Sequence, residues 1–430
     1  MKLAGIRVLY VSYYFPPLGG IASIRALKNV KYLRELGCEV QVLTAQTTLL
    51  RHPRDPGLQK ELPSGITVWR AWCPDAEWLF KLLYGLRLGG LVRFLRQRVF
   101  FPDPQKLCLP FARRKLNQLM KADAKPEIAV ISSGPPSSLS LGLILKEKFR
   151  VPFICDFRDE WTNNPERINL DYPARVQSLE LLMESRVLRA CAGVSYLTEL
   201  MRRNFVQHHS CLKGKPSAII PNGFDAADFS GLEPTNHRGC FHLVYCGSFY
   251  DRRQPDSLWT AISSLLQTSR IEAGSLCVDV IGKNTPAFVL GSFANDPAIR
   301  DCVKFHGFMP HRESIRAMLK AEALLLYIPS GRNADSVLTG KIFDYLASGK
   351  PILAIVPPRG LAAEIVLRAG TGFVADYQDI PGIAAAFLHL YELWRQGGLG
   401  VIKPDREYVS SFSRRSQAEK LAGLIEEVLS

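Results

Sequence analysis

The 430-residue sequence predicts an α/β protein built from two doubly wound halves, each with a parallel sheet. Short apolar segments alternate with longer helical patterns, as they do in consecutive βαβ units. The alternation starts again near residue 241, after a stretch that is rich in turn-forming residues. Each half has the ordinary size of a domain.

The first half opens with a predicted strand over Arg7–Ser12, a turn over Phe15–Gly20 and a helical pattern over Ile21–Leu36. The next apolar segment, Glu39–Leu43, completes a strand–helix–strand unit of a parallel sheet. The other predicted strands of this half are Ile128–Ser132, Phe153–Cys155, Gly193–Tyr196 and Ser217–Ile220. The N-terminal apolar segment is too short for a signal peptide and runs into two prolines, so we interpret it as a strand.

The second half follows the segment Ala226–Gly239, which contains turn formers and few large apolar residues and is the predicted linker. The predicted strands of this half are Phe241–Cys246, Cys277–Ile281, Val303–Phe305, Ala323–Tyr327, Pro351–Ile355 and Gly372–Val374. A last helical pattern covers Ser413–Leu429. We expect a first domain over residues 1–228, a linker over 229–240, a second domain over 241–408 and a C-terminal helix within 409–430.

The composition excludes several architectures and suggests an anionic partner. Apolar residues make up 47% of the chain and charged residues 22%, which is ordinary for a globular protein. Disorder, collagen and a small disulfide-rich scaffold are therefore excluded as the main architecture. Lys and Arg number 54 against 40 Asp and Glu, a net charge of +14. That excess favours a phosphorylated small molecule, an anionic lipid or a nucleic acid as partner.

The ten cysteines are scattered along the chain, with no CxxC pair and no Cys/His cluster in the sequence. Most of them lie in apolar segments, as Cys155 and Cys246 do. This pattern predicts buried free thiols in a reducing compartment. A zinc site is not expected, because the usual ligand spacing is absent.

A basic segment over residues 78–125 carries eleven Lys and Arg and two Asp, a net +9 of the chain's +14. Its first part interleaves Trp, Leu and Phe with the cations at helix-like intervals, and its charges exclude a membrane-spanning helix. A helix lying in the plane of an anionic membrane surface fits this pattern. The alternative is a core-packed helix with a solvated basic face. Nucleic acid is not expected, because no known binding motif is present.

Two loops at predicted strand ends are candidates for ligand binding. Gly19 and Gly20 lie where the first predicted helix begins, and its N-terminus could hold an oxyanion or a sugar hydroxyl. Asp156, Arg158 and Asp159 follow another predicted strand, at the sheet edge where open α/β folds bind ligands. They could bond a hydroxyl-rich substrate or supply a base, and a surface turn with local ion pairs is the alternative.

The most specific pattern of the second half is the run from Ser336 to Ile352. Gly340 begins a helix, Lys341 lies in its first turn, and Asp344 follows three residues later on the same face. Lys341 and the helix N-terminus could hold a diphosphate. Asp344 could accept hydrogen bonds from ribose hydroxyls. The alternative is a carboxylate that only complements the helix dipole, beside a solvated lysine.

These motifs resemble those of retaining glycosyltransferases of family 4, which have the GT-B fold. The matching stretches are VSYYFPPLGG, SGPPSSLSLGLILKEKFRVPFICDFRDEW, IIPNGFDAADF, YCGSFYDRR, VKFHGFMPHRESIRAMLKAEALLL and TGKIFDYLASGKPIL. The PPSS and DFRDEW stretches resemble a bacterial subgroup of cell-envelope polysaccharide synthesis. The resemblance implies two Rossmann-like domains with parallel sheets facing a cleft. It also implies that the C-terminal helix returns to the first domain.

The resemblance assigns the donor site mainly to the second domain. Asp344 takes the place of the ribose-binding glutamate, and Lys341 with Arg252 or Arg253 would neutralise the diphosphate. The other residues that the resemblance places around the donor are Gly19, Gly20, Ser248, His306, Phe308, Met309 and Gly340. Asp156, Arg158 and Asp159 would contact the transferred sugar or the acceptor and are the candidate catalytic residues. Asn222 and Gly223 would form the turn before the interdomain hinge.

The chain departs from the family pattern at two positions. Ser336, with Asp335 beside it, replaces the first glutamate of the E-x7-E motif, and Ser248 replaces an arginine that often follows the first strand of the second domain. The first property that these departures affect is the choice of donor sugar.

The resemblance implies transfer, with retention, from a UDP- or GDP-sugar to a lipid-linked or polysaccharide acceptor. We expect no metal and no other cofactor, a cytoplasmic location at the inner face of the membrane, and contact with anionic lipid through residues 78–125. The alternatives are a nucleotide-sugar epimerase or phosphorylase and a non-catalytic sugar-binding relative on the same fold.

Overall fold

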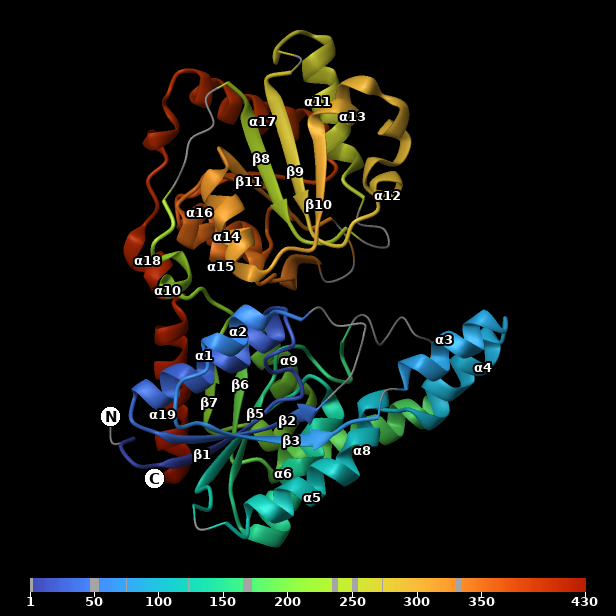
Figure 1. Ribbon diagram of the computed structural model, residues 1–430, viewed down its shortest axis with the longest axis vertical. Helices are drawn as coiled ribbons and strands as arrows, with labels where there is room; N and C mark the ends of the chain where they lie inside the picture. The colour runs from blue at the N-terminus through green and yellow to red at the C-terminus, as the bar shows by residue number, and fades with distance from the viewer. Residues whose placement is uncertain are drawn as a thin grey trace. The chain divides into compact units, whose positions relative to one another are not determined.

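Each half of the chain folds around its own parallel sheet in the computed structural model (Figure 1). The structure describes residues 3–46, 54–74, 76–122, 124–164, 172–233, 239–249, 254–272, 274–329, 331 and 334–430. One unit comprises Met1–Asn222 and Arg414–Ser430, and the other comprises Gly223–Ser413. The division therefore lies at Asn222 and Gly223, and the segment predicted as a linker belongs to the second unit.

The first unit has a seven-stranded sheet in the order β3-β2-β1-β4-β5-β6-β7, with every neighbouring pair parallel. Its strands are β1 (Arg7–Val11), β2 (Glu39–Gln46), β3 (Thr67–Trp72), β4 (Ile128–Ser132), β5 (Phe153–Asp156), β6 (Gly193–Tyr196) and β7 (Ser217–Ile219). The central strands β4, β5 and β6 are buried along their whole length. Strands buried on both faces read as continuous apolar runs, which is why the sequence reveals them.

Helices cover both faces of this sheet. The helices of the unit are α1 (Ile21–Glu35), α2 (Pro56–Lys60), α3 (Glu77–Gly85), α4 (Gly89–Phe94), α5 (Leu109–Leu119), α6 (Ser140–Phe149), α8 (Ala174–Ala190), α9 (Glu199–His208) and α19 (Arg414–Leu429). On one face α1 and α19 pack together over Val8 and Tyr10, and on the other α5, α6 and α8 pack over Leu9 and Val11. Alternate residues of β1 thus point into two separate cores.

Strand β3 is one element that the sequence does not reveal. It pairs with β2 at the edge of the sheet, and only one of its six residues is buried. Thr67 and Arg70 interrupt its apolar residues, so it lacks the continuous apolar run that marks the inner strands.

The second unit has a six-stranded sheet in the order β10-β9-β8-β11-β12-β13, again parallel throughout. Its strands are β8 (Phe241–Cys246), β9 (Leu276–Ile281), β10 (Val303–Gly307), β11 (Ala323–Tyr327), β12 (Ile352–Ile355) and β13 (Gly372–Ala375). All six match predicted strands to within two residues at each end. Two doubly wound parallel sheets confirm the predicted α/β class.

The helices of the second unit also lie on both faces of its sheet (Figure 1). They are α10 (Ala226–Phe229), α11 (Asp256–Gln267), α12 (Pro286–Leu290), α13 (Pro297–Cys302), α14 (His311–Lys320), α15 (Lys341–Ser348), α16 (Leu361–Arg368), α17 (Ile380–Arg395) and α18 (Arg406–Ser410). Trp259 of α11 and Phe387 of α17 pack in one core with Leu243, whereas Phe343 of α15 and Ile365 of α16 pack in the other.

The first part of the basic segment forms two short α-helices where the sequence suggested one. Helix α3 ends at Gly85, Arg87 has a φ of 59°, and α4 begins at Gly89. A left-handed residue between two glycines interrupts the helical hydrogen bonds. Within the described part of the chain, no helix combines the length and the apolar character that crossing a membrane requires.

The cysteines differ in part from the expected free thiols. Cys73 and Cys108 form a disulfide between the segment after β3 and the start of α5. The eight other cysteines are free, and six of these are buried. This disulfide was not predicted, because its cysteines are 35 positions apart and β3, which positions Cys73, was not predicted either.

Candidate active site

In the second unit, a tight turn follows β8 at the edge where the parallel strands end. The side chain of Asn284 holds this turn, since its Oδ1 accepts from the Phe249 amide at 2.8 Å and its Nδ2 donates to the Gly247 carbonyl at 2.9 Å. Tyr345 of α15 contacts the residue just before this turn, because its hydroxyl accepts a hydrogen bond from the Cys246 amide at 2.9 Å. The turn after β8 and helix α15 are therefore fixed against each other.

The side chain of Lys341 packs against this turn at Gly247. Gly340 precedes α15, and Lys341 is its first residue. The Lys341 Nζ donates to the Tyr245 hydroxyl at 3.1 Å and lies 4.6 Å from the centre of that ring. A Cβ atom at Gly247 would lie 2.1 Å from the Lys341 Cε, so the lysine needs a glycine there. The structure thus places a cation beside the N-terminus of α15 at the end of β8.

Asp344 lies one turn further along α15, and it is buried. Its Oδ2 is 3.2 Å from His311 Nε2, and His311 Nδ1 is 3.6 Å from Asp228 Oδ2, so the imidazole bridges two carboxylates. Burial raises the pKa of Cys246 to about 12, with Lys341 acting to lower it and Asp344 to raise it. Lys341 and Asp344, two oppositely charged residues of α15, therefore both influence Cys246, the last residue of β8.

His306 lies at the end of β10 and joins a chain of polar groups. Its Nε2 is 2.6 Å from Asp279 Oδ1, and the other oxygen of Asp279 is 3.0 Å from His242 Nδ1. Burial acts to raise the pKa of Asp279, but the hydrogen bonds of the two histidines outweigh it and the pKa is lowered. Asp279 is therefore held as a carboxylate between two imidazoles.

The other predicted donor residues of this unit differ in exposure. Phe308 is 43% exposed, and Met309 packs partly buried against the core under α14 and α15. Ser248 is half-buried in the turn after β8. Arg252 and Arg253 lie outside the described residues.

The two positions related to the E-x7-E motif lie in a short 3-10 turn. Ala334–Ser336 forms that turn, in which Asp335 is exposed and Ser336 is half-buried. Neither side chain belongs to α15 itself.

In the first unit, Asp156 is almost completely buried at the end of β5. Arg25 of α1 donates two hydrogen bonds to its carboxylate, from Nη2 to Oδ1 at 2.7 Å and from Nε to Oδ2 at 3.2 Å. The Ser195 hydroxyl donates to Oδ1 at 2.7 Å. Burial acts to raise the pKa of Asp156, but Arg25 outweighs it and the pKa is lowered. The carboxylate is thus ionised and held by three donors.

Arg25 also links neighbouring elements. Its guanidinium donates to the carbonyl oxygens of Ile220 and Pro221, both at 3.0 Å, just after β7. Sequence reasoning missed Arg25. The available signal is a charged residue among the apolar residues of the buried stripe of α1, where Ile24 and Leu27 flank it.

Gly19 and Gly20 lie between β1 and α1, as predicted. Gly20 has a φ of 92°, which favours glycine, and its carbonyl accepts the first helical hydrogen bond from Ile24. It is exposed, and no side chain caps the helix. The backbone N–H groups at this N-terminus are in a position to meet an anion or a hydroxyl.

Arg158 and Asp159 follow β5 on the loop beyond Asp156. The Arg158 guanidinium lies 5.8 Å from the centre of the Tyr14 ring. A Cβ atom at Gly134, after β4, would clash with the Arg158 guanidinium, so a larger residue there would require the arginine side chain to move. Asp159 is exposed.

Within each unit the structure brings some predicted residues together. Lys341, Asp344 and the turn at Gly247 and Ser248 converge in the second unit. In the first unit, Asp156 ends β5 and Arg158 lies two residues further, on the loop that follows. The donor, catalytic and acceptor roles assigned to these residues stay predictions.

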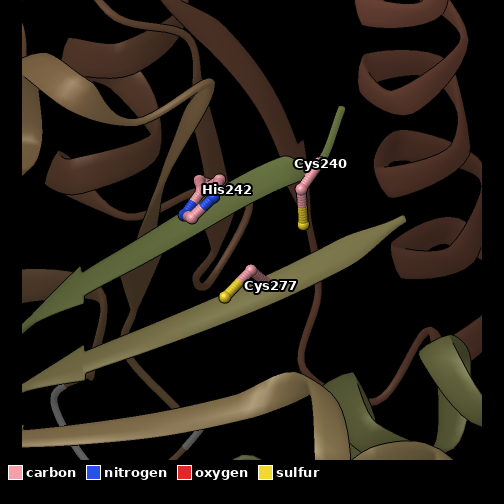
Figure 2. A group of neighbouring side chains, drawn as sticks. All are labelled: Cys240, His242 and Cys277. Atoms are coloured by element: carbon pink, nitrogen blue, oxygen red, sulfur yellow. The ribbon is translucent and has the colours of Figure 1, made fainter. Parts of the chain in front are cut away.

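The structure also forms a Cys/His group that the sequence did not predict. Ligand atoms of Cys240, His242 and Cys277 all lie within 4.8 Å of one another. The spacing along the sequence shows no Cys/His cluster, and only the fold brings these three residues together. Figure 2 shows the three side chains on two neighbouring strands.

Two family models match the chain in sequence. Residues 19–223 match the glycosyl transferase 4-like domain, and residues 240–393 match glycosyl transferases group 1. The first match ends at the division between the structural units, at Asn222 and Gly223, and the second lies wholly within the second unit. No curated protein sequence matches the chain significantly.

Solved structures match the whole chain in fold. The chain is similar to sucrose-phosphate synthase from Thermosynechococcus elongatus, with a TM-score of 0.63, 15% identity, and coverage of 98% of this chain and 99% of that one. It is similar to Anabaena HepE in complex with UDP, with a TM-score of 0.61, 13% identity and coverage of 98% and 100%. It is also similar to WaaG, a glycosyltransferase involved in lipopolysaccharide biosynthesis, with a TM-score of 0.54, 13% identity and coverage of 97% and 99%.

Identities this low establish the fold, and the two family models establish the membership. The chain therefore belongs to the family 4-like glycosyltransferases of the GT-B fold.

Proposed function

We propose that this glycosyltransferase moves a sugar from a UDP- or GDP-sugar to a lipid-linked or polysaccharide acceptor, with retention at the anomeric carbon. The observation that carries the proposal is the convergence of Lys341 and Asp344 on one turn of α15, at the end of β8. In open α/β sheets this edge is where ligands bind. The UDP in the HepE complex supports a nucleotide diphosphate as the leaving group.

The charges of this site suit the proposed reaction. Cleaving the bond from the anomeric carbon to the diphosphate develops positive charge on the sugar and negative charge on the leaving group. Lys341 and the N-terminus of α15 would stabilise that negative charge, and Gly247 leaves the space the lysine needs. Asp344, oriented by His311, would accept hydrogen bonds from the ribose hydroxyls. We propose that the transfer itself needs no metal ion.

In the first unit, the loop after β5 would meet the transferred sugar or the acceptor. Asp156 would orient this loop through its bonds with Arg25 and Ser195. Arg158 and the exposed Asp159 would then be the residues that reach substrate hydroxyls.

The acceptor's location is proposed from the surface of α3 and α4. Large apolar side chains are exposed there, from Leu91 at 43% to Trp78 at 63%, beside Arg93, Arg96 and Arg98. This exposure supports a helix pair lying on an anionic membrane, while Phe80 and Val92 pack in a small core on the other side of the pair. We propose that the enzyme works at the inner face of the cytoplasmic membrane, on an acceptor of cell-envelope polysaccharide synthesis.

Binding and turnover test the proposal separately. We expect UDP or GDP to bind in calorimetry, and we expect Asp344→Ala to weaken that binding by about 1–3 kcal/mol through the loss of charged hydrogen bonds. Lys320→Ala, an exposed lysine on α14, is the control and should bind as the wild type does. Unchanged affinity in Asp344→Ala would falsify the ribose-binding role.

Product analysis distinguishes the alternatives. Release of UDP or GDP that depends on an added membrane extract supports transfer, whereas conversion of the donor without any acceptor indicates an epimerase. Tight nucleotide binding with no turnover indicates a non-catalytic relative, the reading that Ser336 in place of a glutamate favours. NMR of the product's anomeric proton decides between retention and inversion.

A further inference from the structure

The parallel register of β8 and β9 aligns three potential metal ligands at the start of these strands. His242 and Cys277 are partners in register, so their side chains point to the same face of the sheet. Cys240 lies two residues before His242 and shares that face. Figure 2 shows Cys240 and His242 at the start of one strand and Cys277 on its neighbour. The opposite face carries Phe241 and Leu276 into the core.

The distances suit a single divalent ion. The two sulfur atoms and the imidazole nitrogen lie within 4.8 Å of one another. In a tetrahedral zinc site, with bonds of about 2.3 Å to sulfur and 2.0–2.1 Å to nitrogen, neighbouring ligand atoms are about 3.5–3.8 Å apart. Side-chain shifts of about 1 Å would therefore close the site. Two thiolates and one imidazole are also the donor set that Zn²⁺ prefers over Mg²⁺ or Ca²⁺.

A second residue orients the imidazole, as in established zinc sites. Asp279 Oδ2 lies 3.0 Å from His242 Nδ1, which assigns Nε2 to the metal. A carboxylate behind a metal-binding histidine fixes the ring and makes it a stronger donor. Asp279 is two residues after Cys277 on the same strand and so lies on the same face.

The electrostatic surroundings favour a thiolate site that water can reach. Two thiolates, a neutral imidazole and Zn²⁺ sum to zero charge, and the two thiols release their protons on binding. Lys304 of β10 is paired in register with Asp279 and interacts with the Cys277 sulfur, so it can hydrogen-bond to the bound thiolate. A pocket of about 500 Å³ opens beside Cys240, Cys277 and Lys304.

We propose that Cys240, His242 and Cys277 form a binding site for a divalent ion of the Zn²⁺ class, with water as the fourth ligand. The site lies at the edge where the strands begin, whereas Gly247 and Lys341 lie at the edge where they end. From His242 to Cys246 the strand spans about 13 Å. The ion therefore does not act on the donor diphosphate, and the inference goes beyond the proposed function.

The site has a physical connection to a predicted donor residue. Asp279 joins His242 on one side and His306 on the other, at 3.0 and 2.6 Å. An ion on His242 would fix Asp279 and, through it, the imidazole that the resemblance places near the nucleobase. The proposed role is to fix the loop after β10.

Spectroscopy with Co²⁺ tests the site on the full-length protein after reduction and removal of metals. We expect one equivalent of Co²⁺ to give thiolate-to-metal charge-transfer absorption and the intense visible bands of a tetrahedral ion, and Zn²⁺ to displace it. The Cys240→Ser/Cys277→Ser variant should lose the charge-transfer absorption. Cys211→Ser changes a partly exposed thiol of the first unit and should keep the full signal.

A second variant keeps the test independent of folding. Asp279→Asn retains both sulfur ligands and should keep the spectrum while weakening affinity about 10- to 100-fold. The proposal is overturned if the wild type gives no tetrahedral thiolate spectrum or if the double serine variant gives the same one. A third outcome would also overturn it: the reduced protein binds no Co²⁺, and on oxidation Cys240 and Cys277 form a disulfide. UDP calorimetry on the metal-free protein checks the proposed function separately.

Discussion

A buried ion pair between Arg25 and Asp156 organises the end of the first unit's sheet. Each side chain is 1% exposed, and the pair connects α1, β5 and the segment after β7. We expect Arg25→Met to lower the free energy of unfolding by about 3–5 kcal/mol, because it leaves a buried carboxylate without its cation. Urea denaturation followed by the fluorescence of the first unit's tryptophans would measure this loss.

Replacing both partners is the matched control for this prediction. In Arg25→Met/Asp156→Leu no buried charge remains, so the double variant should be more stable than Arg25→Met alone. A double variant that unfolds as easily as the single one would show that the loss comes from packing and not from the unpaired charge.

The same pair gives a pH dependence with a defined sign. The pKa of Asp156 is lower in the folded protein than its ordinary value of 3.8, despite burial, because of Arg25. Its stabilising contribution is therefore complete above pH 3.8 and disappears as the pH falls through the folded value. The difference in unfolding free energy between wild type and Asp156→Asn should shrink below pH 3.8; a difference that grows there would contradict the assignment.

The sequence predicted those site residues whose relation is local, but not the partners that the tertiary fold brings to them. The i,i+3 spacing placed Lys341 and Asp344 on one helix correctly, because spacing within a helix is a local property. The partners of those residues come from other elements: Tyr245 of β8 meets Lys341, and His311 of α14 meets Asp344. The same holds for Cys240 and Cys277, which only the register of β8 and β9 brings together. Register between strands far apart in sequence cannot be read from composition or period.

Helices α3 and α4 are the elements with the most unusual surface. Trp78 and Leu82 on α3 are more than half exposed, and Arg93, Arg96 and Arg98 lie on α4 and the turn after it. Each cation near an anionic surface contributes about 1 kcal/mol to binding. We expect Gln at the three arginines to reduce pelleting with phosphatidylserine vesicles about 100-fold in affinity.

Two controls separate membrane binding from a general charge effect. Gln at Arg300, Lys320 and Arg395 removes equal charge from the second unit and should leave pelleting unchanged. Trp78→Ser/Leu82→Ser keeps every charge and should weaken binding to neutral and anionic vesicles alike, because it removes buried apolar area. Equal pelleting by all these proteins would refute the membrane surface.

At the level of elements, burial decides what could be predicted. The strands β4 and β8 were predicted to the residue, since each is a continuous apolar run between turn formers. β3 was missed because this edge strand is mostly half-exposed and Arg70 interrupts its apolar residues. The break between α3 and α4 was missed because a left-handed Arg87 has no clear sequence signal.

Across the whole molecule, the chain completes its first unit with its last helix. Helix α19 buries Leu421, Leu424 and Ile425 in the core that also holds α1. We expect Leu421→Ala to cost about 2–5 kcal/mol, the usual range for a buried leucine. Hydrogen exchange should then become faster in peptides of α1 and β1, while peptides of β8 to β13 keep their rates.

Leu429→Ala is the matched control on the same helix, because Leu429 is 37% exposed. It should change stability by less than about 0.5 kcal/mol. Faster exchange in the second unit after Leu421→Ala would show that the two units unfold together and would contradict the prediction.

The backbone passes from one unit to the other at Asn222 and returns at Arg414, and the two crossings are neighbours in space. The Phe224 amide donates to the Phe412 carbonyl at 3.2 Å, and Phe224 bridges to Ser413. Residues 223–413 are thus an insertion with adjoining ends. A segment of this kind can be exchanged between relatives by joining only two seams, so chimaeras cut at these positions would test whether the second unit sets the sugar preference.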